Sequence, residues 1–245
     1  MQKSKLIREQ IWSKLHAVAK PDSRFNLNFA EVIPDFEGSE RATDRIAGLQ
    51  DYKDSNFAFS TPDNCLTDLR RRMIEEGTSF IMSTYGIYRG FVLMQPGMVP
   101  KGAELYAAWL DGMEHFAQPV SLADIANIGR LDFMVTGASA VSEDGIRFGK
   151  GHGFFDIEWG MFTDLGLSDE TTPVVALVHD CQLVQEKLTP NSTDIIVDYV
   201  ATPDRLHTAD RQVRRPRGIK WELLDPKQIE ATPPLQELQH IQGLA

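Results

Sequence analysis

The stretch RFGKGHGFFDIEWGMF, residues 147–162, places glycine at three alternate positions and then continues as an amphipathic pattern. Phe154, Ile157, Met161 and Leu165 recur at helical spacing, which predicts a helix that begins directly after the glycines. The preceding segment LDFMVTGASAVSEDGI, residues 131–146, is typical of a strand followed by a turn. The predicted order is therefore strand, glycine loop, helix.

A glycine loop that ends at a helix start is suited to binding an anion. Backbone N–H groups in the first turn of a helix have no partner within the helix, and glycine lets them face a ligand without a Cβ in the way. Arg147 and Lys150 add positive charge, which favours phosphate. The spacing matches neither G-x-x-x-x-G-K-[ST] nor G-x-G-x-x-G, so spacing alone leaves open a phosphate loop and a purely structural glycine turn.

The composition favours a globular protein that binds small molecules. The 245 residues, of which 42% are hydrophobic, provide for one large domain or two small ones. A formal net charge of −10 disfavours a protein that coats nucleic acid or lies on an anionic membrane. Two cysteines are too few for a disulfide framework, and no Cys/His spacing resembles a zinc site. Because the charged N-terminus lacks the apolar segment of a signal peptide and no run is long enough to cross a bilayer, we expect a cytoplasmic protein.

Short apolar runs alternate with helical patterns along most of the chain. Apolar residues at helical spacing predict one helix over 6–15 and another, containing Leu66, Leu69 and Met73, that ends near Gly77. This alternation of strands and helices predicts a largely parallel α/β sheet with helices packed on it. The runs interpreted as strands are residues 78–83, 91–94, 131–136, 173–178 and 194–200.

The end of the chain differs in composition from the rest. RQVRRPRGIK, residues 211–220, concentrates basic residues, and PPLQELQHIQGLA, residues 233–245, is typical of a short helix. We interpret this part as a solvated extension, with a binding role as the alternative. The expected organisation is an α/β domain over residues 1–224 and a C-terminal tail over residues 225–245.

Several segments resemble one enzyme family. GIRFGKGHGFFD, residues 145–156, resembles the G-x-R-L-G-x-G-x-G-Y-Y-D signature of the 5-formyltetrahydrofolate cyclo-ligases, also called methenyltetrahydrofolate synthetases. HDCQLV and DIIVDYVATP resemble the closing pattern of that family, while IREQIW, IPDFEGS and RPRGIKW are similar to its divergent branch, the methenyltetrahydrofolate synthetase domain-containing proteins. The resemblance implies a three-layer α/β/α fold with a largely parallel sheet, of the cyclo-ligase and CoA transferase-like kind.

The resemblance also implies a reaction that uses ATP, Mg²⁺ and a folate. In this family ATP phosphorylates the formyl oxygen of 5-formyltetrahydrofolate, N10 attacks the activated carbon, and phosphate leaves as the 5,10-methenyl ring closes. Such chemistry depends mainly on positioning and electrostatic stabilisation. We expect ATP and a folate or related small molecule as partners, and neither nucleic acid nor a membrane.

Roles for individual residues follow from the resemblance. Arg147 and Lys150 would neutralise phosphate, and the glycine amides would cradle it. Asp156 would orient the loop or help to hold magnesium, although an Asp in a first helical turn also simply stabilises the helix. For the basic residues near the N-terminus, solvated helix charges are the alternative. The predicted nucleotide-binding residues are Lys3, Lys5, Arg8, Gly149, Gly151, His152, Gly153, Phe154 and Phe155.

The sequence also departs from the cyclo-ligase pattern. Phe154 and Phe155 stand where the family usually has tyrosines, and Ile157 replaces a basic residue. The substrate-side glutamate of the family has only approximate counterparts in Asp63 and Asn64. Three functions therefore stay open: an ATP-dependent cyclo-ligase, a non-catalytic nucleotide- or folate-binding module, and a related enzyme linked to thiamine metabolism.

Overall fold

A central eight-stranded sheet organises the computed structural model, which describes residues 2–244, with side chains described from residue 4 onward. Its strands are β1 (Phe57–Ser60), β2 (Ser79–Ser83), β3 (Phe91–Met94), β4 (Gln118–Val120), β5 (Phe133–Thr136), β8 (Val174–Leu177), β10 (Tyr199–Ala201) and β11 (Leu206–Thr208). Their order across the sheet is β11-β10-β8-β5-β1-β2-β3-β4. The five consecutive strands from β10 to β2 are parallel, whereas β3, β4 and β11 pair antiparallel with their neighbours.

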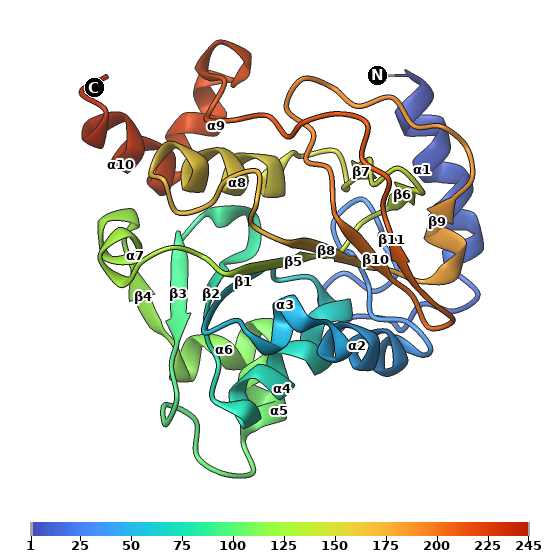
Figure 1. Ribbon diagram of the computed structural model, residues 1–245, viewed down its shortest axis with the longest axis horizontal. Coiled ribbons are helices and arrows are strands. Elements are labelled where there is room, and N and C mark those ends of the chain that lie inside the picture. The colour runs from blue at the N-terminus through green and yellow to red at the C-terminus, as the bar shows by residue number, and fades with distance from the viewer. Residues whose placement is uncertain (1, 245) are drawn as a thin grey trace.

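Helices cover both faces of this sheet (Figure 1). The helices are α1 (Gln2–Leu15), α2 (Ser39–Gly48), α3 (Gln50–Lys53), α4 (Thr67–Glu76), α5 (Glu104–Ala108), α6 (Leu110–Phe116), α7 (Leu122–Ile128), α8 (Phe154–Asp164), α9 (Pro226–Glu230) and α10 (Pro233–Ile241). Side chains from α7, α8 and α10 form the core on one face, and side chains from α2, α4 and α6 form it on the other. The expected three-layer α/β/α fold with a largely parallel sheet is confirmed.

A second, smaller sheet lies beside α1. It consists of β6 (Ala140–Ser142), β7 (Arg147–Phe148) and β9 (Leu183–Val184) in the order β7-β6-β9. Ile7 and Ile11 of α1 pack against Ala140 and Phe148 of this sheet. The N-terminal helix is thereby placed next to the segment that follows β7.

The middle strands are largely apolar because they are buried on both faces. Phe57 and Phe59 of β1 pack into the core that contains α8, whereas Ala58 packs into the core on the opposite face. Successive residues of a strand point to opposite faces, so a sheet covered on both sides needs apolar residues at every position. This explains why these strands appear in the sequence as continuous apolar runs.

The predicted helices at both ends of the chain and the predicted strands over 78–83, 91–94, 131–136 and 173–178 are confirmed. The predicted strand over 194–200 is wrong for its first part, residues 194–198, because β10 contains only Tyr199–Ala201. Ile196 instead forms a single antiparallel bridge with Ile146, and the N–H of Val197 donates to the carbonyl of Gly145 at 2.9 Å. This first part of the run is buried against the turn before β7.

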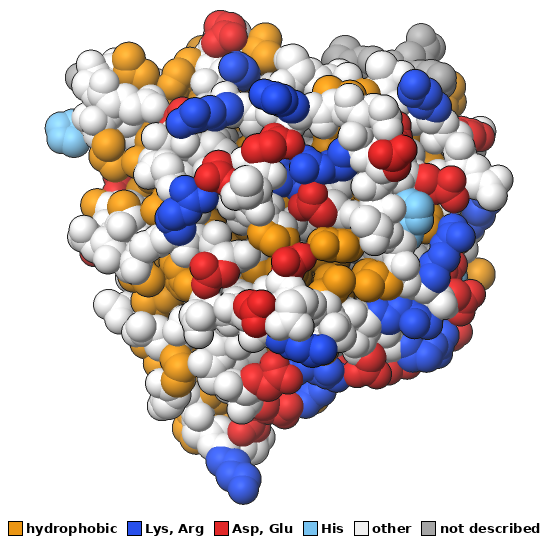
Figure 2. Space-filling model, in the orientation of Figure 1, with side chains coloured by type: hydrophobic (Ala, Val, Ile, Leu, Met, Phe, Trp, Pro, Cys, Tyr) orange, Lys and Arg blue, Asp and Glu red, His pale blue; other side chains and the backbone are white. Residues whose placement is uncertain are grey.

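The charged surface agrees with the composition. Figure 2 shows basic and acidic side chains interspersed on the face that it presents. Within residues 2–244, no helix has both the length and the apolar character needed to span a bilayer. The expected cytoplasmic location stays a prediction.

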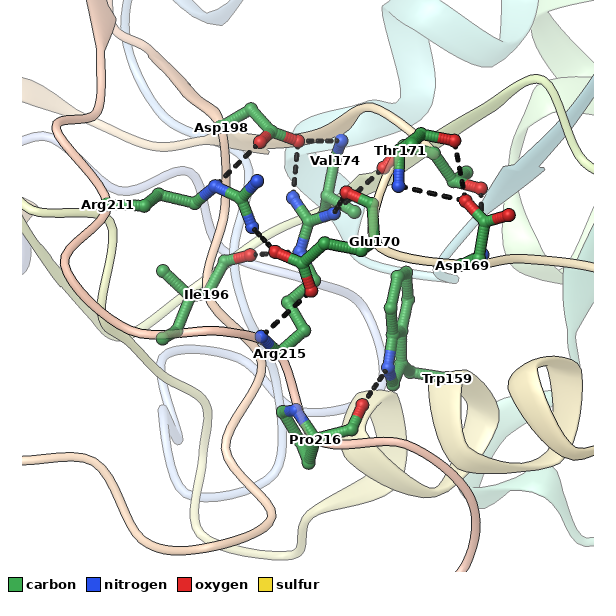
Figure 3. Close-up of polar contacts among 11 residues, drawn as sticks. Trp159, Asp169, Glu170, Thr171, Val174, Ile196, Asp198, Arg211, Arg215 and Pro216 are labelled. Atoms are coloured by element: carbon green, nitrogen blue, oxygen red, sulfur yellow. Dashed lines mark hydrogen bonds and ion pairs between the residues drawn. The ribbon is translucent and has the colours of Figure 1, made fainter.

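The basic segment 211–220 is anchored to the domain, so it is not a fully solvated extension (Figure 3). The guanidinium of Arg215 is buried, pairs with the carboxylate of Asp198, and donates to the carbonyls of Ile196 at 2.6 Å and Thr172 at 2.9 Å. It also lies 5.1 Å from the ring centre of Trp159 on α8. The indole N–H of Trp159 donates to the carbonyl of Pro216, the residue after Arg215, at 2.8 Å. The interpretation as a solvated extension is therefore wrong for this segment.

The last two helices are also packed on the domain. Leu235 and Leu238 of α10 are fully buried in the core that contains α8. The carboxylate of Glu237 accepts hydrogen bonds from the N–H groups of Leu122 and Ala123, both at 3.0 Å, and so caps the start of α7. A division of the chain at residue 224 stays a prediction.

We expect Arg215→Ala to lower the free energy of unfolding by about 2 kcal/mol, because Asp198 and two carbonyls lose a charged donor. Arg217→Ala is the matched control, since Arg217 is exposed and makes no ion pair with any residue in the described range, and we expect a change below about 0.5 kcal/mol. Urea denaturation of both variants measures the difference. Equal stability of the two variants would contradict the anchoring role of Arg215.

Candidate functional site

The glycine loop, residues 149–153, connects β7 to α8. Gly151 and Gly153 have φ values of +116° and +70°, which L side chains rarely adopt. Gly153 is the N-cap of α8, so the loop leads directly into the unpaired N–H groups of the first helical turn. The predicted order of strand, glycine loop and helix is confirmed.

The glycine loop forms one wall of a pocket of about 240 Å³. The opposite walls are residues 61–63, directly after β1, and residues 83–87, at the end of β2. Because β1 and β2 are neighbouring parallel strands, their carboxyl ends meet at the same edge of the sheet, which is where ligands bind in open α/β sheets. Arg8 of α1 and the loop residues Asn191, Thr193 and Asp194 complete the wall.

Three cationic side chains surround the glycine loop. Arg8 donates from Nε to the carbonyl of Gly149 at 2.7 Å, and Arg147 donates from Nε to the carbonyl of Gly137 at 2.9 Å. Lys150 donates from Nζ to the carbonyl of Glu31 at 3.1 Å. Each cation is thus fixed through backbone carbonyls, and none of the three forms an ion pair with a described carboxylate. Burial and the charge of Arg147 lower the pKa of Arg8, while Asp194 opposes them.

The other predicted basic residues are placed differently. Lys5 is exposed, lies 3.9 Å from Glu9, and does not line the pocket. The side chain of Lys3 lies outside the described residues. His152 lines the pocket from the glycine loop, with Nε2 at 3.2 Å from the carbonyl of Ala30. The structure therefore places Arg8 and His152 in the wall of the pocket and gives no support for a contact from Lys5.

The two phenylalanines after the loop line the pocket but pack in different ways. Phe154 is half-buried and stacks on His152, with ring centres 5.4 Å apart. Phe155 is buried, stacks on Phe59 of β1, and lies 4.8 Å below the guanidinium of Arg147. Phe155 therefore supports the position of Arg147, and neither side chain offers a hydroxyl to a ligand.

Asp156 occupies the first turn of α8, close to Asp194. Its Oδ1 accepts a hydrogen bond from the N–H of Ile195 at 3.0 Å. Burial raises the pKa of Asp156 to about 6; Arg147 opposes this effect and Asp194 adds to it. Among the described residues no group of three or more His, Cys, Asp or Glu could hold a metal ion. Two carboxylates at one pocket nevertheless suit Mg²⁺, which commonly binds one or two carboxylates together with water and substrate phosphates.

A buried arginine of α4 fixes the loop that carries Asp63. Arg70 is fully buried and donates to the carbonyls of Thr61 at 2.9 Å and Asp63 at 3.0 Å. Burial lowers the pKa of Arg70 to about 10, so the group stays charged at neutral pH. Asp63 in turn accepts hydrogen bonds through Oδ2 from Thr61 Oγ1 at 2.5 Å and Gly137 N at 2.9 Å. This arrangement leaves Oδ1 of Asp63 without a hydrogen bond from any described residue.

Glu158 of α8 lines the same pocket and was not predicted from the sequence. It is 1% exposed, and neither its Oε2 nor the Oγ of Ser83 makes a hydrogen bond of normal geometry with a described residue. Burial raises the pKa of Glu158 to about 8, and the nearby Ser83 hydroxyl partly opposes this effect. A buried polar group without a partner costs about 1–3 kcal/mol, so the protein keeps two such groups at an energetic cost.

The side chains that line the pocket therefore differ between its two ends. Arg8, Arg147 and Lys150 gather at the glycine loop, while Asp63 and Glu158 lie with Ser83 at the strand ends. Glu158 follows Phe154 by four residues, about one helical turn, and so lies on the helix face that the apolar spacing predicts to be buried. A charged residue at a position predicted to be buried is the signal by which the sequence indicates a functional role for Glu158. Asp194 has no comparable signal, because it depends on a loop that only the fold brings close.

Comparison with known proteins assigns the chain to a family. The model of the 5-formyltetrahydrofolate cyclo-ligase family matches residues 1–203. A bovine methenyltetrahydrofolate synthase domain-containing protein is 32% identical over 238 residues, which cover 96% of this chain and 61% of that protein. The human protein of the same name is 31% identical, over 95% of this chain and 60% of its own length. The chain thus spans about three fifths of the length of these curated relatives.

Named enzymes show a more distant similarity. A 5-formyltetrahydrofolate cyclo-ligase from Escherichia coli is 36% identical over 87 residues, which cover 36% of this chain and 44% of the enzyme. A solved structure of a 5,10-methenyltetrahydrofolate synthetase from Aquifex aeolicus aligns with a TM-score of 0.49 and 21% identity, over 86% of this chain and 94% of that one. Because the family model matches most of its length, this chain belongs to the 5-formyltetrahydrofolate cyclo-ligase family.

Proposed function

We propose that this protein is an ATP-dependent ligase that converts 5-formyltetrahydrofolate to 5,10-methenyltetrahydrofolate. The γ-phosphoryl group of ATP passes to the formyl oxygen, N10 attacks the activated carbon and loses its proton, and phosphate leaves with that oxygen. Membership of the family supports the reaction class. The observation that carries the proposal is the convergence of three cations on a glycine loop within one pocket.

The cationic end of the pocket would hold the transferring phosphoryl group. Arg147 is preorganised by the carbonyl of Gly137 and the ring of Phe155, so its terminal nitrogens are free to donate to phosphate oxygens. Arg8 and Lys150 are fixed in the same way by backbone carbonyls. Fixed donors stabilise developing charge without having to reorganise during the reaction, which is the main contribution that this chemistry needs.

Asp156 and Asp194 are the carboxylates that we propose for magnesium, since both line the pocket beside the glycine loop. When bound there, Mg²⁺ would supply charge neutralisation between the nucleotide phosphates. The N–H of Ile195 donates to Oδ1 of Asp156, so Oδ2 would be the oxygen available to the metal.

A second function is favoured by one specific observation. Phe155 packs on Phe59 where the cyclo-ligases usually carry a tyrosine, so no hydroxyl is present at that position. A protein that binds nucleotide and folate without turnover would be consistent with this loss. In that case either ligand would raise the thermal midpoint, since each binds the native state preferentially, but no product would form.

The enzyme hypothesis predicts ATP-dependent product. We expect purified protein with 5-formyltetrahydrofolate, ATP and Mg²⁺ to form 5,10-methenyltetrahydrofolate, followed by its absorbance, with reactions lacking ATP or containing EDTA as controls. Product in the complete mixture alone is the expected result. A folded protein that binds both ligands and forms no product would replace the ligase by the binding module.

Lys150→Ala should lower turnover by about a hundredfold, because an electrostatic donor to the transferring group is lost. The matched control is Lys101→Ala, which removes an exposed lysine outside the pocket and should leave turnover within twofold of the wild type. Steady-state rates of both variants at saturating ATP decide the point. Wild-type turnover in Lys150→Ala would remove this residue from the site.

Asp156→Asn keeps an acceptor for the N–H of Ile195 but weakens a magnesium ligand. We expect the Mg²⁺ concentration for half-maximal rate to rise about tenfold or more. Asp204→Asn, an exposed substitution outside the pocket, is the control. An unchanged Mg²⁺ dependence in Asp156→Asn would leave that residue only its helix-stabilising role.

A further inference from the structure

The strand end of the pocket contains polar groups that the proposed phosphoryl transfer does not use. Glu158 Oε2 and Ser83 Oγ are both buried, both line this pocket, and neither makes a hydrogen bond of normal geometry with any residue among 4–244. Such groups are rare in folded proteins and call for an explanation at each position. Here both lie in the wall of a pocket, so a bound ligand would satisfy them.

These groups act together as acceptors of hydrogen bonds. Asp63 Oδ1 is a third acceptor, since the partners of this carboxylate are both on Oδ2. A carboxyl group keeps an acceptor oxygen in either protonation state, and a serine hydroxyl has two acceptor lone pairs. The charged groups that act on Glu158 are Asp63, Asp156 and Arg147, so two of the three are negative. The strand end therefore favours a neutral or cationic group rich in N–H donors.

We propose that the strand end of the pocket binds the edge of a nitrogen heterocycle that carries an amino group next to a ring N–H, and that Glu158 determines this specificity. The inference rests on the proposed function, in which the heterocycle is the aminopyrimidine edge of the folate. Adenine fits less well, because its amino group is flanked by ring nitrogens that are acceptors and would face the carboxyl oxygens. The phosphates of ATP then bind at the glycine loop and the folate ring at Glu158.

Direct binding of 5-formyltetrahydrofolate and of ATP, each measured by calorimetry, tests this inference. Glu158→Met removes the acceptors with an unbranched side chain of similar length, and Glu158→Gln retains one acceptor oxygen. We expect folate affinity to fall about tenfold or more in Glu158→Met and by less in Glu158→Gln. ATP affinity should stay within twofold of the wild type in both. Glu186→Met, an exposed substitution outside the pocket, is the matched control.

Thermal unfolding of the ligand-free variants separates binding from a structural role. Because Glu158 has an unpartnered oxygen, Glu158→Met should unfold at the same temperature as the wild type or higher. A lower midpoint in Glu158→Met, together with wild-type folate affinity in Glu158→Gln, would overturn the inference. Unchanged folate affinity in both variants would also overturn it. So would a selective loss of ATP affinity, because the strand end would then bind adenine and not the folate ring.

The turnover assay distinguishes failure of this inference from failure of the proposed function. Wild-type protein that binds folate through Glu158 but forms no product supports the inference and removes the ligase activity. Turnover that persists with unchanged folate affinity in Glu158→Met removes the inference alone. Wild-type protein that binds no folate overturns both.

Discussion

The buried guanidinium of Arg147 is the interaction on which the site depends. It lies between the carbonyl of Gly137 and the ring of Phe155, and thereby ties the turn after β5 to the first turn of α8. A Cβ on Gly149 would approach its Nη2 to 3.3 Å, so glycine there leaves space for the guanidinium beside the loop. A buried arginine requires partners for its charge. The carbonyl of Gly137 and the ring of Phe155 supply part of them, and an anion bound here would supply the rest. The charge of Arg147 also opposes the rise in pKa that burial causes at Asp156 and at Glu158, and so acts on both ends of the pocket.

The part of the chain beyond residue 203, which the family model does not match, is integrated into the fold and not appended to it. Arg215 and Pro216 hold Trp159, which lies in the middle of α8, and Gln228 donates to the carbonyl of His152 in the glycine loop at 3.4 Å. The helix that begins at the glycine loop is therefore fixed at its start by the pocket and along its outer side by the C-terminal segment.

Local patterns predicted more of the fold than of the site. Helical spacing in α1, α4 and α8 and continuous apolar runs in β2, β5 and β8 reflect burial that each element would have in any protein of this architecture. The run 194–197 was wrongly predicted as strand, because apolar character indicates burial and does not specify which sheet, if any, the residues join. Within the site, the glycine loop was visible because glycine and a helix start are adjacent in sequence. Asp63 and Asp194 come from two separate loops and Ser83 from the end of β2, and only the sheet topology brings them together.

Backbone hydrogen exchange with and without ligands tests the central claim most directly, namely that the two ends of one pocket bind the two substrates. The account predicts that ATP with Mg²⁺ slows exchange of the amides of residues 149–156, whereas 5-formyltetrahydrofolate slows exchange around residues 83–87 and Glu158. Protection of the glycine loop by neither ligand, with slowed exchange only in segments outside the pocket, would contradict it.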